Sequence, residues 1–177
     1  MTSDELRALQ APLKSRYKDE PTSARIVLSA QGRVGPDGPT CTMDSVRQPA
    51  VAGLHPAAGG DGSLLCSGDM LLEALAGCAG VTLGAVSTAL GISLRSASVH
   101  ADGDLDFRGT LGVAKDAPVG FTAIRLAFHL DSDASEEVLA KLVSLTERYC
   151  VVYQTLRAGV PITTSYTRAS VPAASPV

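Results

Sequence analysis

The pattern of apolar and polar positions divides the first third of the chain into helix-like and strand-like stretches. Residues 3–19 have the mixed charged and apolar spacing of a short amphipathic helix, which Pro21 would end. Residues 22–54 contain three short stretches typical of strands, ARIVLSAQG, TCTMDSV and QPAVAGL, separated by turns rich in Gly and Pro. Residues 55–67 predict a loop, because Gly, Ala and Pro dominate them.

The next stretch, residues 68–90, predicts a helix that is apolar nearly all round. Ser67 is a good N-cap, and Gly91 stands where a helix commonly ends. Two stripes at helical spacing, one through Leu71 and Leu75 and the other through Leu72 and its neighbours, are equally apolar. Such a helix is expected to be buried on nearly all sides, and its many small residues would let other backbone approach closely.

The second half of the chain repeats the change from strand to helix. Residues 92–107 and 121–131 predict strands, the second with clean alternation. Asp133 and Glu136 form a predicted capping box, and helical spacing continues to Leu156 before Gly159. The stretch PITTSYTRA predicts a final strand. The order of elements is α+β without βαβ alternation, so we expect a leader at 1–21, one domain at 22–168 and a disordered tail at 169–177.

Composition narrows the function classes. A net charge of −3, 4% aromatic residues and no Trp disfavour a nucleic-acid partner. The charged N-terminal stretch lacks the apolar run of a signal peptide, and the helix at 68–90 fits a buried helix better than a membrane span, so a cytoplasmic protein is expected. Three His and no C-x-x-C disfavour a zinc site. The glycine loop lacks the Lys of a phosphate-binding P-loop.

Four cysteines carry the candidate chemistry. Cys78 and Cys150 fall on the two apolar helices, where a free thiol is most often core filling. Two thiols on two helices could instead meet as a peroxidatic and resolving pair, if a nearby cation lowers the pKa of one thiol. Cys41 and Cys66 are interpreted as background, and His55 as either a ligand-gating or a loop-fixing residue.

Two charged residues are candidates for the same site. Arg33, in AQGRVG, could supply the cation. Asp69 lies nine residues before Cys78, about 13 Å away along one helix axis, so it could serve the site only from a second subunit.

The segments that carry the two helix cysteines resemble the OsmC/Ohr family of thiol peroxidases. SGDMLLEALAGCAGVTL is similar to the family's first cysteine helix, and ERYCVVYQTLRAGVPITTS to its second cysteine helix and the strand that follows. DFRGTLGVAKDAPVGFTAIRLAFHL resembles its middle strands, so the resemblance spans residues 22–168.

The resemblance implies an intertwined homodimer, with curved antiparallel sheets wrapped around central buried helices and active sites at the interface. It implies that Cys78 is the peroxidatic thiolate, that Cys150 is the resolving thiol and that Arg33 is the activating cation. No cofactor is implied; an external dithiol, lipoyl-protein-like or thioredoxin-like, would reopen the disulfide. Three residues depart from the family pattern: Glu147 stands where the family commonly has His, Val151 where it has Pro, and Gly68 where the Ohr branch has Glu. These departures indicate an OsmC-like side branch. Asp69, one position after Gly68, is the nearest substitute for the missing Glu.

The sequence therefore predicts a thiol-dependent peroxidase that reduces organic hydroperoxides, with hydrogen peroxide as a further candidate substrate. Two alternatives remain open from the residues: the same dimer could bind a small apolar ligand with inert cysteines, or it could act as a thiol redox sensor. Tight ligand binding without thiol reactivity would favour the first alternative. Slow turnover with a large conformational change on oxidation would favour the second.

Overall fold

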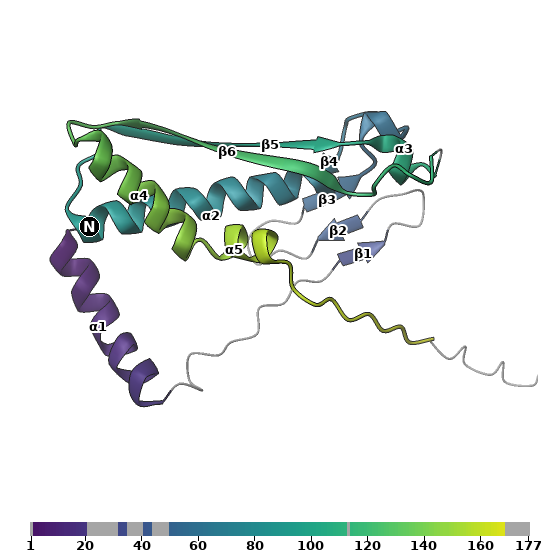
Figure 1. Ribbon diagram of the computed structural model, residues 1–177. Coiled ribbons are helices and arrows are strands. Elements are labelled where there is room, and N and C mark those ends of the chain that lie inside the picture. The colour runs from purple at the N-terminus through teal and green to yellow at the C-terminus, as the bar shows by residue number, and fades with distance from the viewer. Residues whose placement is uncertain (1, 21–31, 35–40, 44–49, 113, 169–177) are drawn as a thin grey trace, which may run out of the picture.

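The computed structural model describes residues 2–20, 32–34, 41–43, 50–112 and 114–168. A long central helix, α2 (Ser67–Leu90), lies beneath a two-stranded hairpin of β5 (Ser96–Leu105) and β6 (Phe121–Asp131) (Figure 1). Two helices, α4 (Glu136–Tyr149) and α5 (Val151–Ala158), pack on α2 as well. Helices and antiparallel strands in separate blocks make this an α+β fold, as predicted.

The central helix α2 ends where the sequence predicts. It stops at Gly91, whose φ of 68° lies in the left-handed region that favours glycine. It begins at Ser67 and is capped by Cys66, so the predicted N-cap is one residue late. By length and composition α2 could cross a membrane, a property that core helices share; in the structure it packs against α4, α5 and β5.

The expectation that α2 is buried nearly all round is wrong within one chain. One stripe, made of Leu75, Ala79, Leu83 and Ser87, is buried against the other elements. Another face of the helix is open to solvent: Val81 is 76% exposed, and nothing lies within 4 Å of where a Cβ on Gly77 or Gly84 would stand. The structure therefore leaves a small-residue apolar face of α2 uncovered.

The hairpin confirms the alternation read from the sequence. β5 and β6 pair antiparallel from Ser96↔Asp131 to Leu105↔Phe121, with one register shift at Asp104/Leu105. The alternating residues Ile124, Leu126 and Phe128 are more buried than their neighbours and belong to the inner face. A short helix that the sequence does not signal, α3 (Phe107–Thr110), lies in the connection and is capped by Asp106.

The last helical stretch is not continuous. The predicted helix breaks at Cys150, whose backbone is extended (φ −72°, ψ 112°) and which ends α4 and precedes α5. The cap of α4 is Ser135, whose Oγ accepts a hydrogen bond from the Val138 N–H at 3.4 Å, rather than Asp133. Asp133 lies too early for that role and pairs with Arg95 at 2.6 Å instead.

A small sheet and the N-terminal helix complete the described parts. α1 (Ser3–Asp19) matches its predicted bounds and contacts α2. Four short strands follow the order β1-β2-β3-β4, with β3 and β4 parallel and the others antiparallel. They are β1 (Gly32–Val34), β2 (Cys41–Met43), β3 (Ala50–Gly53) and β4 (Leu65–Cys66). The remainder of the strands expected at 24–32 and 40–46, the first two residues of the strand expected at 48–54, and the tail at 169–177 lie outside the described residues.

The final strand predicted from PITTSYTRA does not form in the single chain. Residues 159–168 have no regular secondary structure, and Ile162 and Tyr166 are almost fully exposed. A strand needs a neighbouring strand to satisfy its backbone groups, and this segment has none among the described residues.

Candidate functional site

The fold brings Cys78 and Cys150 together. Cys78 lies halfway along α2 and is half-buried, whereas Cys150 lies at the break between α4 and α5 and is fully buried. Both are free thiols, and each affects the pKa of the other through a hydrogen bond between the two sulfur groups. Two cysteines that are 72 residues apart in the sequence (150 − 78) thus meet as a pair of thiols.

The N-terminus of α5 points its backbone donors at Cys78. Burial acts to raise the pKa of the Cys78 thiol, but hydrogen bonds from the Val152 N–H, the Cys150 thiol, the Val151 N–H and the Thr82 hydroxyl outweigh it. The pKa of Cys78 is therefore held below the ordinary value of a cysteine. No side chain of α5 caps its first turn, so these N–H groups and the positive end of the helix dipole are available to the sulfur.

The pKa of the second thiol, Cys150, is shifted in the opposite direction. Burial is the main cause that raises the pKa of Cys150; the Tyr153 N–H lowers it, and the negative charge of Cys78 raises it further. Of the two thiols, Cys78 is therefore the one that loses its proton more readily. A half-buried thiolate beside a buried thiol is an arrangement that can attack an electrophile and then close a disulfide.

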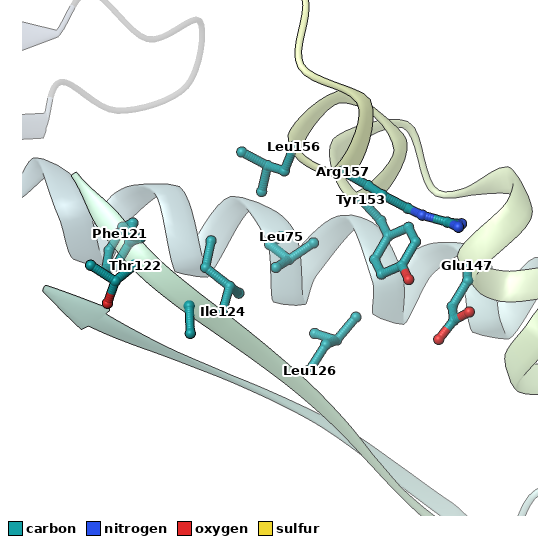
Figure 2. Close-up of a pocket in the computed structure, with 10 residues that line it drawn as sticks. Leu75, Phe121, Thr122, Ile124, Leu126, Glu147, Tyr153, Leu156 and Arg157 are labelled. Atoms are coloured by element: carbon teal, nitrogen blue, oxygen red, sulfur yellow. The ribbon is translucent and has the colours of Figure 1, made fainter. Parts of the chain in front are cut away.

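A cavity of about 470 Å³ lies between α2, α5 and the inner face of β6 (Figure 2), and neither Cys78 nor Cys150 is among its lining residues. One end is apolar, with Leu75, Ile124 and Leu126 among its walls, and Figure 2 shows Glu147 and Arg157 at the other end. The lining residues of both ends flank the thiols, since Leu75 is one turn before Cys78 and Glu147 is one turn before Cys150. Within the described part of the chain, Glu147 and Arg157 form no ion pair.

The structure does not bring Asp69 to its own Cys78. Nine residues are two and a half helical turns, so the two side chains lie on opposite faces of α2. Asp69 lines a shallow groove with Glu73 and His100, against β5. Its proposed role from a second subunit stays a prediction.

The remaining candidates fall elsewhere. The backbone of Arg33 lies in β1, but its side chain, like that of Cys41, is outside what the structure describes. Cys66 is the half-buried N-cap of α2. His55 accepts a hydrogen bond from the Ala57 N–H at 3.0 Å and stacks on Phe107 at 5.0 Å between ring centroids, which is the geometry of a loop-fixing residue.

Sequence reasoning missed the groups that surround the Cys78 sulfur. The donors of Val151 and Val152 are backbone groups, and they become available only because the helix breaks at Cys150. Thr82 could have been identified from the sequence, because a residue four positions after a cysteine in a helix lies on the same face as that cysteine. Among the described residues, no three His, Cys, Asp or Glu side chains gather in a way that could hold a metal ion.

Comparisons with known proteins identify the relatives of this fold. The family described as OsmC-like protein matches residues 60–165, and a search of curated proteins finds no match. An OsmC-like protein from Mycoplasma pneumoniae is 18% identical, with a TM-score of 0.63 over 76% of this chain and 89% of that one.

Two further solved structures have names that mention hydroperoxides. An organic hydroperoxide resistance protein OsmC from Legionella pneumophila is 14% identical (TM-score 0.59, covering 75% of this chain and 92% of that one). A putative organic hydroperoxide resistance protein from Vibrio cholerae, with captopril bound in one active site, is 16% identical (TM-score 0.56, covering 77% and 89%). Identities this low establish the shared fold, while the family match spans more than half of the chain. The chain that holds the Cys78–Cys150 pair belongs to the OsmC-like protein family.

Proposed function

We propose that the protein is a thiol-dependent peroxidase that reduces organic hydroperoxides. The observation that carries this proposal is the asymmetric pair of thiols, with the pKa lowered at half-buried Cys78 and raised at buried Cys150. A role of the OsmC-like family in redox chemistry or hydroperoxide resistance agrees with this pair. Inert core cysteines would need no such difference between two adjacent thiols.

The reaction would run in three steps. The Cys78 thiolate attacks the terminal oxygen of the hydroperoxide, the O–O bond breaks, and the leaving alkoxide takes a proton to become an alcohol. Cys78 is now a sulfenic acid, and the Cys150 sulfur displaces its hydroxyl as water to form a disulfide. An external dithiol, lipoyl-protein-like or thioredoxin-like, reduces the disulfide and becomes oxidised itself.

The cavity between α2, α5 and β6 supports an organic substrate. Its apolar end would bury the carbon chain or ring of a hydroperoxide, which hydrogen peroxide lacks. Apolar burial therefore favours bulky hydroperoxides over hydrogen peroxide, which would react without that binding contribution.

The exposed face of α2 supports a homodimer. Val81 with Gly77 and Gly84 forms an apolar surface on which a second copy of the helix could approach closely. Such a dimer would cover this surface and the half-buried Cys78. It is also the arrangement in which Asp69 of a partner subunit could serve the site, while Arg33 remains the proposed activating cation.

Turnover with a matched set of variants tests the proposal. We expect the pre-reduced protein to consume cumene hydroperoxide faster than hydrogen peroxide in the presence of dihydrolipoamide. Cys78→Ser should abolish turnover and Cys150→Ser should prevent repeated turnover, whereas Cys66→Ser, which alters a half-buried thiol outside the pair, should retain it. Equal rates in the wild type and Cys78→Ser would refute the peroxidase.

A further inference from the structure

A hydroxyl group on α2 lies next to the proposed reactive sulfur. Thr82 follows Cys78 by four residues, so the two side chains stack on one face of the helix. Its Oγ1 lies 2.8 Å from the Cys78 carbonyl oxygen, to which it donates a hydrogen bond. The hydroxyl thus lies over Cys78 itself.

This hydrogen bond is not needed by the carbonyl that receives it. Cys78 and Thr82 both lie inside the continuous helix α2, where the Cys78 carbonyl already accepts the Thr82 backbone N–H. A hydroxyl has one hydrogen that rotates about the C–O bond to suit its surroundings. It can therefore leave the carbonyl without leaving that acceptor unsatisfied.

A negative sulfur is the stronger acceptor. Hydrogen bonds to ionised groups are roughly twice as strong as those between neutral groups. The Thr82 hydroxyl already belongs to the groups that favour the charged form of Cys78, together with the Val151 and Val152 N–H groups. Among the described groups that shift the pKa of Cys78, Cys150 is the one titratable side chain.

We propose that Thr82 is a positioning residue, whose hydroxyl turns from the Cys78 carbonyl to the Cys78 sulfur when the thiolate forms. The N–H groups of α5 hold the sulfur from one side and the Thr82 hydroxyl holds it from α2, so the thiolate has one preferred orientation. The catalytic meaning of this role rests on the proposed peroxidase function. The role itself concerns the thiol alone and can be measured without a peroxide.

The test compares three variants by the rate at which Cys78 is alkylated across a range of pH. Iodoacetamide reacts with the thiolate, and mass spectrometry of the peptide that contains Cys78 separates its signal from the other cysteines. Thr82→Val keeps the shape of the side chain and removes the hydroxyl, whereas Thr82→Ser keeps the hydroxyl. Thr88→Val is the matched control, because the Thr88 hydroxyl makes the same 2.8 Å bond to the Gly84 carbonyl on the same helix.

We expect Thr82→Val to move the alkylation midpoint of Cys78 to higher pH and to slow alkylation at neutral pH by about tenfold, the effect of losing one hydrogen bond to a charged group. Thr82→Ser should restore most of the rate, and Thr88→Val should leave it unchanged. A midpoint that is the same in Thr82→Val and the wild type would overturn the proposal. So would equal shifts in Thr82→Val and Thr88→Val, since these would report a general effect on the helix.

Peroxide turnover then separates the two proposals. If the peroxidase exists, kcat/KM for cumene hydroperoxide should fall in Thr82→Val in parallel with the alkylation rate. If the wild type shows no turnover, the peroxidase fails while the alkylation result still decides the role of Thr82.

Discussion

At the level of single residues, the chemistry of this chain depends on how the surroundings of Cys78 and Cys150 differ. Cys78 and Cys150 are the same residue type on apolar helices, and their difference comes from which backbone donors and how much solvent each one meets. The N–H groups that favour a charged Cys78 belong to the residues directly after Cys150.

Site-resolved alkylation should reveal this difference directly. We expect Cys78 to react at a pH below that of an ordinary cysteine, because its pKa is lowered, and Cys150 to react only at higher pH, because its pKa is raised. The reference is the same chain unfolded in urea, where both peptides should titrate alike. Equal midpoints in the folded protein would contradict the asymmetry.

Only part of this site could be read from the sequence. The helical spacing around Cys78 and the apolar run around Cys150 predict two helices that can meet. In the structure, α2 contacts both α4 and α5. The break at Cys150 has no local signal, because Val151 and Val152 continue the apolar pattern without a Gly or Pro. The donors for the Cys78 sulfur are consequences of that break, so composition and spacing could not identify them.

At the level of secondary-structure elements, the stability of helix α5 is linked to the protonation state of Cys78. This helix has eight residues, none of them buried, and no side chain of its own caps its first turn. The Cys78 sulfur accepts from its first N–H groups and therefore acts as its cap from another helix. By linkage, a helix that lowers the pKa of a thiol is itself stabilised by the thiolate.

Hydrogen exchange can measure that linkage. The pKa of Cys78 is lower in the folded protein than in the unfolded chain, so the stabilisation is fully present above the unfolded pKa and is lost as pH falls through the folded pKa. We expect protection of 151–158, corrected for intrinsic exchange, to fall across that window in the wild type. In Cys78→Ala it should be lower by about 1 kcal/mol at the upper end of that window and should not fall as pH is lowered through it, because Cys150, whose pKa is raised, changes stability only at higher pH. Protection of α4 serves as the internal reference.

Packing of α4 on α2 depends on a small number of buried side chains. Leu142 is fully buried, whereas Val138, one turn earlier, is exposed. We expect Leu142→Ala to lower the free energy of unfolding by about 2–5 kcal/mol, because it leaves a cavity at the centre of the helix packing. Val138→Ala should cost far less in the same urea titration. Similar losses for both would mean that α4 does not pack as described.

The whole molecule has more apolar surface than one chain can bury. The sequence predicts a central helix buried on nearly all sides, yet one face of α2 is open, and the predicted strand at 161–169 has no neighbour among the described residues. The periodicity of apolar residues shows which positions are expected to be buried, but it cannot show whether the surface that covers them belongs to the same chain. Both mismatches have one physical explanation in the proposed dimer, because a second copy would cover α2 and offer a sheet edge to the final segment.

A charge on the open face of α2 tests the dimer. We expect Val81→Lys to convert a dimer into a monomer in light scattering, because the ammonium group would be buried without a partner at the interface. Leu111→Lys is the control, since Leu111 is 54% exposed on a different part of the molecule. A wild type that is monomeric throughout, or a Val81→Lys variant that remains dimeric, would contradict this arrangement.

A single turnover followed by peptide mapping would identify the cysteine that a hydroperoxide oxidises first. The reduced protein is mixed with one equivalent of cumene hydroperoxide without reductant, and all cysteines are then identified by mass spectrometry. We expect a Cys78–Cys150 disulfide in the wild type and, in Cys150→Ser, a sulfenic acid on Cys78 that a dimedone probe captures. Oxidation that begins at Cys150 or Cys66, or a Cys78 that stays reduced, would contradict this expectation.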